Sequence, residues 1–244
     1  MSSRARLVLG SVVAGICASQ VQAAAIRPVP NPDIASVTVA VGGTQVPIPT
    51  ISSDGTVTFS ETNIAIGNAI ITGINGTLAS DPFLAFSLSV TDNSAGGSSF
   101  AFLFSIPLSP TLVGPQDVHA TLGVTATGIP GFSATVTPTF VDFMLNNVGA
   151  CAAGVDIGAP AFTAPARASV THNYDSGDVV YIPNGGCDDQ LTAFVAFDGT
   201  GHGTQYAMTG ELDITPIPEP AALELFGIGL LGLAALRGRV VLRT

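Results

Sequence analysis

The sequence predicts an all-β protein, an antiparallel β-sandwich or jelly roll, and three observations support this fold class. Apolar residues alternate with polar or small ones, as at Val37, Val39 and Val41, which is the period of two expected of a strand with one buried face. Turn-forming residues separate such runs at short intervals. Between the two chain ends there is no long helical pattern, which disfavours a parallel sheet with crossover helices.

Composition agrees with a folded, exported β-protein. The chain has 244 residues, a formal net charge of -10, 10% charged residues and 47% hydrophobic residues, so it carries more apolar surface than a disordered chain would. Lysine is absent, and five of the seven arginines lie in the terminal segments. Nucleic acid is not an expected partner, because phosphate binding requires clustered basic side chains.

The expected strands follow one another closely along the chain. They cover residues 37–41, 57–59, 86–90, 100–104, 118–127, 132–143, 168–173, 179–182, 191–197 and 205–214. A hairpin turn is predicted at Asn75-Gly76, since both residue types tolerate positive φ. Residues 93–97 are expected to join the 86–90 and 100–104 strands in a longer hairpin, and the glycine-rich residues 199–203 are interpreted as a flexible hairpin. With 13 Phe and no Trp, the core should be rich in phenylalanine, with Phe102 near its centre.

The N-terminus has the features of a secretory signal peptide over residues 1–25. Arg4 and Arg6 form a basic start, an apolar run follows, and small residues around Ala23 form a cleavage site, with Ala25 as the second choice. An uncleaved N-terminal anchor is the alternative. Residues 26–33, which contain three prolines, should form an extended leader, and the β-sandwich ectodomain is expected over residues 34–215.

The C-terminal residues 216–244 combine three features in a fixed order. A triplet of Pro218, Glu219 and Pro220 precedes an apolar run over 221–236, and an arginine cluster follows at Arg237, Arg239 and Arg243. A helix of about 16 residues rises about 24 Å, which is marginal for a single transmembrane helix across a hydrocarbon core of about 30 Å. Arginines beyond the run favour a cytoplasmic C-terminus. The alternatives are an ordinary C-terminal membrane anchor and a buried amphipathic helix.

This arrangement resembles the PEP-CTERM sorting signal of Gram-negative bacteria, and the resemblance covers about the last tenth of the chain. It implies export, transient insertion in the inner membrane and processing near the triplet by an exosortase. Delivery to the cell surface or to the exopolysaccharide matrix would follow. The resemblance concerns how the protein is handled and implies nothing about the activity of the ectodomain.

Two cysteines remain after signal cleavage, Cys151 and Cys187. In an oxidising compartment such a pair predicts a disulfide, which would close a loop of about 36 residues and stabilise the fold by up to about 4 kcal/mol. A free nucleophilic or metal-binding cysteine is the alternative, although no helper residue adjoins either one.

Other chemistry-bearing residues form no known motif. The histidines at 119, 172 and 202 match no metal-binding spacing, and no G-x-S-x-G elbow occurs, although a triad assembled from distant residues stays open. The weak candidates for a Ca²⁺ site are loop carboxylates, which are more often solvated turn residues. They are Asp175, Asp178, Asp188 and Asp189.

The sequence therefore predicts an exported, non-enzymatic protein of the cell surface or biofilm matrix that needs no cofactor. Its expected partners are the export machinery, an exosortase and an exopolysaccharide. The alternative is a carbohydrate-binding or adhesive module, with Tyr174, Tyr181 and Tyr206 as candidate sugar contacts. A secreted hydrolase is a weaker third possibility.

Overall fold

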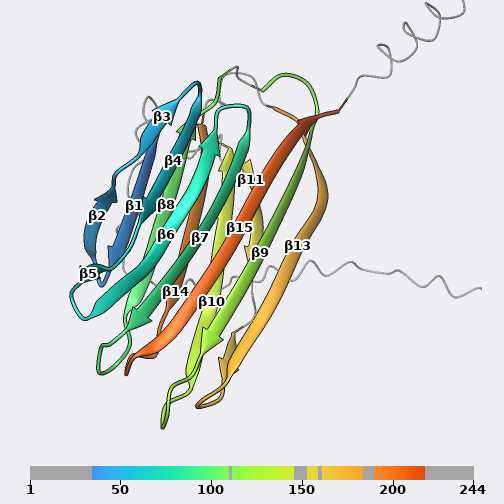
Figure 1. Cartoon of the computed structure of the whole chain (residues 1–244). Helices are drawn as coiled ribbons and strands as arrows, with labels where there is room; N and C mark the ends of the chain where they lie inside the picture. Colours follow the sequence, from blue (N-terminus) through green and yellow to red (C-terminus); the bar gives the residue numbers. More distant parts are fainter. Residues whose placement is uncertain (1–34, 110–111, 146–152, 159–160, 184–189, 218–244) are drawn as a thin grey trace, which may run out of the picture.

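The computed structural model describes residues 35–109, 112–145, 153–158, 161–183 and 190–217. These residues form two antiparallel sheets packed face to face, as Figure 1 shows. The all-β sandwich expected from the sequence is confirmed. The expected signal peptide, its cleavage site at Ala23, the leader and the sorting segment lie outside the described residues.

The first sheet has seven strands, and β12 pairs with β10 beside the main path. In spatial order they are β11 (Ala153–Gly158), β10 (Ala134–Leu145), β14 (Gln190–Asp198), β8 (Ser99–Pro107), β1 (Ser36–Val41) and β2 (Thr44–Ile48), with β12 at Phe162–Ala164.

The second sheet has eight strands, and β5 pairs with β6 beside the main path. In spatial order they are β13 (Ser169–Tyr181), β9 (Gln116–Thr127), β15 (Thr204–Pro216), β7 (Phe83–Asp92), β6 (Ala69–Ala79), β4 (Thr56–Glu61) and β3 (Ile51–Ser53), with β5 at Ile64–Ile66.

Phenylalanine rings fill the space between the sheets. The ring of Phe104 stacks on Phe86 at a centroid distance of 4.6 Å, and Phe100 stacks on Phe197 at 4.9 Å. Phe102 is fully buried, as expected, and its ring lies 6.3 Å from that of Phe197. Such offset ring pairs stabilise a core beyond the area they bury. The prediction of a phenylalanine-rich core is therefore confirmed.

The predicted turn at Asn75-Gly76 is wrong, because both residues lie inside β6 and pair with β7. Gly76 is required there for packing rather than for a turn. A Cβ at this position would lie 2.5 Å from the ring of Phe59 and would also collide with the backbone carbonyl of Ala85. A glycine in a strand often marks such a close approach.

The two short strands expected at 168–173 and 179–182 form one long edge strand, β13. Its pairing with β9 shifts register between Asp175 and Asp178, which marks a β-bulge. The two aspartates that were expected in a turn therefore lie at an irregularity within a strand.

No helix within the described parts of the chain is long and apolar enough to cross a membrane. The apolar run at 221–236 lies outside these parts.

Strand register fixes what lies at each end of the sandwich. At one end, the lower one in Figure 1, the β7–β8, β9–β10 and β14–β15 connections lie together, because Thr204 pairs with Asp92 and Gln205 with Thr127. We call this end the loop end. At the opposite end, Pro216 pairs with Gln116, and the Pro-Glu-Pro triplet follows in the sequence.

Candidate functional site: an uncharged sheet face and an anchored loop end

Many outward positions of the eight-stranded sheet carry short polar side chains, while Ile70, which pairs with Thr91, and the exposed Val180 are apolar. Along β9 and β15 the buried positions alternate with exposed or half-exposed ones, so every second residue points away from the core. We call the half of this surface nearest the loop end the hydroxyl face. It consists of Thr72, Asn75, Ser87, Ser89, Thr91, Gly123, Thr125, Thr127, Ser169, Thr171, Asn173, Gln205, Ala207 and Thr209.

Charge divides this sheet surface into two halves. The hydroxyl face contains no ionisable side chain. In the next pairing row toward the other end, Asp175 and Glu211 flank Thr121, and His119 and Asp213 pair in the row beyond. The hydroxyl face can therefore donate and accept hydrogen bonds without the cost of desolvating a charge.

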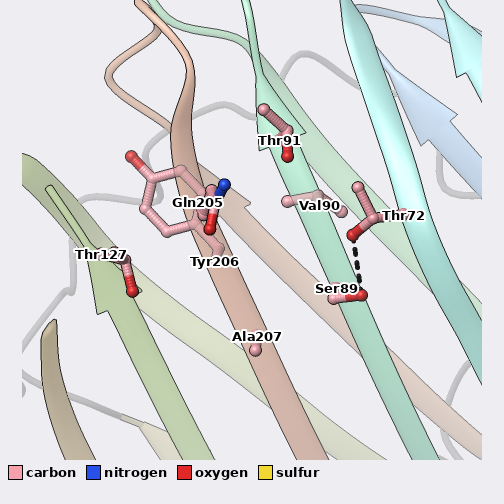
Figure 2. Close-up of a pocket in the computed structure, with 8 residues that line it drawn as sticks. All are labelled: Thr72, Ser89, Val90, Thr91, Thr127, Gln205, Tyr206 and Ala207. Carbon is pink, nitrogen blue, oxygen red and sulfur yellow. Dashed lines mark hydrogen bonds between the residues drawn. The ribbon is translucent and has the colours of Figure 1, made fainter. Parts of the chain in front are cut away.

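Hydroxyl groups of neighbouring strands bond one another across this face. The Thr125 and Thr171 hydroxyl oxygens lie 2.8 Å apart, and so do those of Thr127 and Ser169. The Thr72 hydroxyl donates to the Ser89 hydroxyl at 2.8 Å, as Figure 2 shows. These cross-strand pairs hold the side chains in fixed directions, while the remaining lone pairs of each oxygen can accept a further bond.

An open depression of about 340 Å³ lies on the hydroxyl face. Ala207 lies within it, and the longer side chains of Thr91, Thr127 and Gln205 line it (Figure 2). Because Ala207 pairs with Ser89 on one side and with Thr125 on the other, small side chains of three adjacent strands meet here. The depression is open to solvent, and its lining combines hydroxyl and amide groups with apolar surface of Val90, Tyr206 and Ala207.

A buried carboxylate organises the loop end next to this depression. Asp92 is fully buried and accepts hydrogen bonds from the backbone N–H and hydroxyl groups of Ser94 and Ser98, and from the backbone N–H of Gly201. Five neutral donors thus surround the carboxylate at 2.7 to 3.1 Å. The bond from Gly201 joins the β14–β15 loop to the β7–β8 loop.

The glycine-rich loop at 199–203 joins β14 to β15, which lie in different sheets, so the predicted hairpin is wrong. The hairpin expected at 93–97 is wrong for the same reason, because it joins β7 to β8. Every backbone N–H from Gly199 to Thr204 donates a hydrogen bond, and the acceptors include a backbone carbonyl of Ser94, Ser98 and Asp92. A Cβ at Gly201 would collide with the backbone carbonyl of Ser94. Glycine is therefore needed for close backbone approach, not for mobility.

Tyr206 is not an exposed sugar contact as the sequence suggested, because only 1% of it is accessible. Its ring packs 5.4 Å from that of Phe197 in the core. Its hydroxyl oxygen accepts the backbone N–H of Thr200 at 2.8 Å and lies 3.1 Å from the Thr204 hydroxyl. The residue anchors the loop from inside, which is the ordinary use of an aromatic ring with one polar tip.

The other two candidate tyrosines are half-buried, and neither lies on the hydroxyl face. Tyr174 pairs with the core residue Leu122, which places it on the side of β13 that faces the opposite sheet. Burial raises the pKa of Tyr174 above its ordinary value of 10.0. Tyr181 pairs with the buried Gln116 near the end of the strand.

His119 and Asp175 form an exposed pair on the acidic half of the sheet surface, with Nε2 of the imidazole 3.0 Å from the carboxylate. The backbone N–H of Gly177 also donates to Asp175, and these contacts hold the pKa of the carboxyl below its ordinary value of 3.8. The hydroxyl of Ser176 donates to the Gly177 carbonyl, so it is not aligned as a nucleophile with His119.

The described residues contain no group of three or more His, Cys, Asp or Glu side chains that could hold a metal ion. Of the four aspartates considered for Ca²⁺, Asp175 is engaged by His119 and Gly177, and Asp178 lies across the bulge from it. Asp188 and Asp189 lie outside the described residues, so their part of that expectation stays a prediction.

Cys151 and Cys187 also lie outside the described residues, and the disulfide stays a prediction. The described strands next to them are close together, because Leu145 of β10 pairs with Ala153 on one side and with Leu191 on the other. Two segments that lead to the cysteines therefore flank the same end of one strand.

Comparisons with known proteins give no family for this chain. No family model matches it, and no curated protein matches it either. Among solved structures, it is similar to a family 11 carbohydrate-binding module from Clostridium thermocellum in complex with a β-1,3-1,4-mixed-linked tetrasaccharide, at 10% identity and a TM-score of 0.25, over 77% of this chain and 100% of the other.

Two further structures give similar values. The family 11 carbohydrate-binding module of the cellulase Lic26A-Cel5E of Clostridium thermocellum matches at 11% identity and a TM-score of 0.26, over 77% of this chain and 92% of the other. A structure described as a CBM4 matches at 20% identity and a TM-score of 0.22, over 53% of this chain and 83% of the other. These scores are too low to assign a ligand or a function to this chain.

Proposed function

We propose that this chain is an exported, non-enzymatic protein of the cell surface or exopolysaccharide matrix, and that it contacts neutral polysaccharide through the hydroxyl face. The observation that carries the polysaccharide contact is the set of uncharged hydroxyl and amide side chains around the depression at Ala207. Neutral sugars present hydroxyl groups that both donate and accept hydrogen bonds, and this face offers the same two functions.

Charge favours a neutral glycan over an acidic one. The other half of the same sheet surface carries Asp175, Glu211 and Asp213, and the whole chain has a formal net charge of -10. A polyuronate lying along this surface would meet like charges. The hydroxyl face has none, so an uncharged chain can lie across it without electrostatic cost.

Export and sorting are supported by the two chain ends. The signal-like residues 1–25 and the PEP-CTERM-like segment with Pro218, Glu219 and Pro220 agree with one destination, outside the cytoplasm. In this proposal the C-terminal segment is the substrate of an exosortase, and the sandwich is the cargo. The role of the cargo is retention among polysaccharide chains.

Native gel electrophoresis through gels that contain a polysaccharide tests the contact. The ectodomain should be retarded by mixed-linkage β-glucan or dextran, both neutral, and less by alginate. Ala207→Glu places a larger charged side chain in the depression and should weaken retardation by a neutral gel about tenfold or more in apparent affinity.

Thr215→Glu is the matched control, because Thr215 points outward from the same strand at the far end. It adds the same charge and should behave like the wild type. The proposal is wrong if no neutral polysaccharide retards the wild-type protein. Equal retardation of the wild type and of Ala207→Glu would remove the hydroxyl face as the contact surface.

A further inference from the structure

Two aromatic rings from different connections meet at the loop end of the sandwich. The rings of Phe132 and His202 stack with a centroid distance of 4.0 Å and an interplanar angle of 12°. Phe132 is 43% exposed, and His202 is also exposed. This ring pair therefore presents aromatic surface to solvent, while the phenylalanine rings of the core are buried.

The turn that carries Phe132 is rigid. Pro130 and Gly131 occupy its two central positions, Gly131 has φ of 90°, and the backbone N–H of Phe132 donates to the Ile129 carbonyl at 3.1 Å. Proline followed by a glycine with positive φ is the signature of a type II turn. The position of Phe132 is thus fixed by its own turn.

The turn that carries His202 is equally constrained. His202 and Gly203 have φ of 61° and 87°, and the backbone N–H of Thr204 donates to the Gly201 carbonyl at 3.1 Å. This is the geometry of a type I′ turn, which favours Asn, Asp or Gly at the first central position. The turn itself therefore does not require an imidazole ring at 202.

The two turns are also tied to each other and to the core. The Thr200 hydroxyl donates to the Ser133 carbonyl at 3.2 Å, and the backbone N–H of His202 donates to the Ser94 carbonyl at 2.7 Å. Gly203 lies beside the side chain of Ile129. The ring pair is consequently held in place before any ligand arrives, which reduces the ordering cost of binding.

We infer that the Phe132–His202 ring pair is a stacking platform for one sugar ring of the polysaccharide that lies on the hydroxyl face. The apolar C–H face of a pyranose can pack on the electron-rich face of an aromatic ring while its hydroxyl groups stay in contact with water or polar side chains. This inference rests on the proposed function, because it places a second contact of the same glycan.

Position along the strands supports a continuous contact. Thr127 and Gln205 line the depression, and they lie two and three residues from Ile129 and His202 in the two turns. Three residues span at most about 10 Å, so the Cα atom of His202 lies within about 10 Å of that of Gln205. One glycan chain can therefore reach both the depression and the platform.

His202→Asn separates a binding role from a structural one. Asparagine adopts positive φ readily in this turn type, so the melting temperature should stay the same or rise. Loss of the ring should weaken apparent affinity for mixed-linkage β-glucan in the gel assay by about three- to tenfold, the range expected for one stacking contact. Phe132→Ala should weaken it to a similar degree.

Asp54→Asn is the matched control. Asp54 also has positive φ, 49°, but it lies in the β3–β4 turn, which is next to the paired residues Thr56 and Ala79 at the other end of the sandwich. This variant should bind like the wild type.

Four outcomes decide the inference. Weaker binding by His202→Asn at an unchanged or higher melting temperature supports it. A lower melting temperature with wild-type binding overturns it and makes the stacked rings a packing contact. Wild-type binding by His202→Asn together with loss in Ala207→Glu overturns the platform alone and leaves the proposed function standing. Absence of β-glucan retardation in the wild type overturns both the platform and the proposed function.

Discussion

Asp92 shows how one residue can determine the geometry of two loops at one end of the sandwich. Its carboxylate is fully buried, and all five of its donors belong to two loops that follow β7 and β14. Three of them are backbone N–H groups, which have no other partner available if the carboxylate is removed. The position of His202 depends on this arrangement, since Gly201 precedes it directly.

Asp92→Ala should therefore be strongly destabilising. It would leave three backbone N–H groups without their acceptor, of which that of Gly201 is buried and those of Ser94 and Ser98 are part-buried. At about 1 to 3 kcal/mol each, reduced by relaxation and by access of water, the loss should be about 3 to 5 kcal/mol in the free energy of unfolding. Urea unfolding measures this value. Asp213→Ala, an exposed acid on β15, is the control and should change stability by less than about 0.5 kcal/mol. A loss below about 1 kcal/mol for Asp92→Ala would show that the carboxylate does not organise the loops.

At the scale of the strand, glycines make room for aromatic rings. Phe86 of β7 pairs with Gly76 of β6 on one side and with Gly210 of β15 on the other. A Cβ at Gly210 would lie 2.4 Å from two ring carbons of Phe86. The ring of Phe86 can lie over Gly210 and stack on Phe104 across the core because Gly210 has no side chain.

Gly210→Ala should consequently cost about 1 to 3 kcal/mol of stability, the range for overpacking a core. Alanine has a better strand propensity than glycine, so a purely local effect of the substitution would increase stability instead. Thermal unfolding of this variant beside Thr209→Ala, an outward position on the same strand, gives the comparison. If Gly210→Ala were neutral or stabilising, the close approach of the Phe86 ring would not be rigid.

The long alternating strands could be read from the sequence, because one buried face imposes a period of two on side chains. The alternation along β7, β9 and β15 is regular, and strands were predicted within each of them, over residues 86–90, 118–127 and 205–214. The short strands β2, β3 and β5 were missed, since three to five residues carry too little pattern. Asn75-Gly76 was assigned to a turn because the packing role of a glycine depends on a ring, Phe59, that is distant in sequence.

The candidate site was less accessible to sequence reasoning. Thr125, Thr127 and Gln205 are recognisable as outward positions, but only register brings them together with Ser89 and Thr72 from other hairpins. The rings of Phe132 and His202 come from turns 70 residues apart, and their meeting depends on the whole topology. Tyr206 was misassigned as exposed because an aromatic residue looks the same in sequence whether its ring or its hydroxyl tip reaches the surface.

At the scale of the molecule, the proposed binding end and the exit of the chain lie at opposite ends of the sandwich. β15 begins at Thr204, two residues after His202 of the platform, and ends at Pro216, two residues before Pro218 in the sequence; Figure 1 shows β15 running along the length of the sandwich. Thirteen extended residues at about 3.3 Å each give a separation of about 40 Å. A chain held in a membrane by its C-terminal segment would therefore present the hydroxyl face and the platform away from the bilayer.

This separation predicts that sorting and glycan contact are independent. Replacing Pro218, Glu219 and Pro220 together by alanine should keep the protein at full C-terminal length in the inner membrane fraction, because an exosortase would no longer process it. The detergent-extracted variant should still be retarded by mixed-linkage β-glucan like the wild type. The sorting prediction is measured by intact mass and by fractionation of cells with and without the exosortase. Thr215→Ala is the control variant. Identical mass and location for the variant and the wild type would contradict the sorting role of the triplet, and lost retardation would contradict the independence of the two ends.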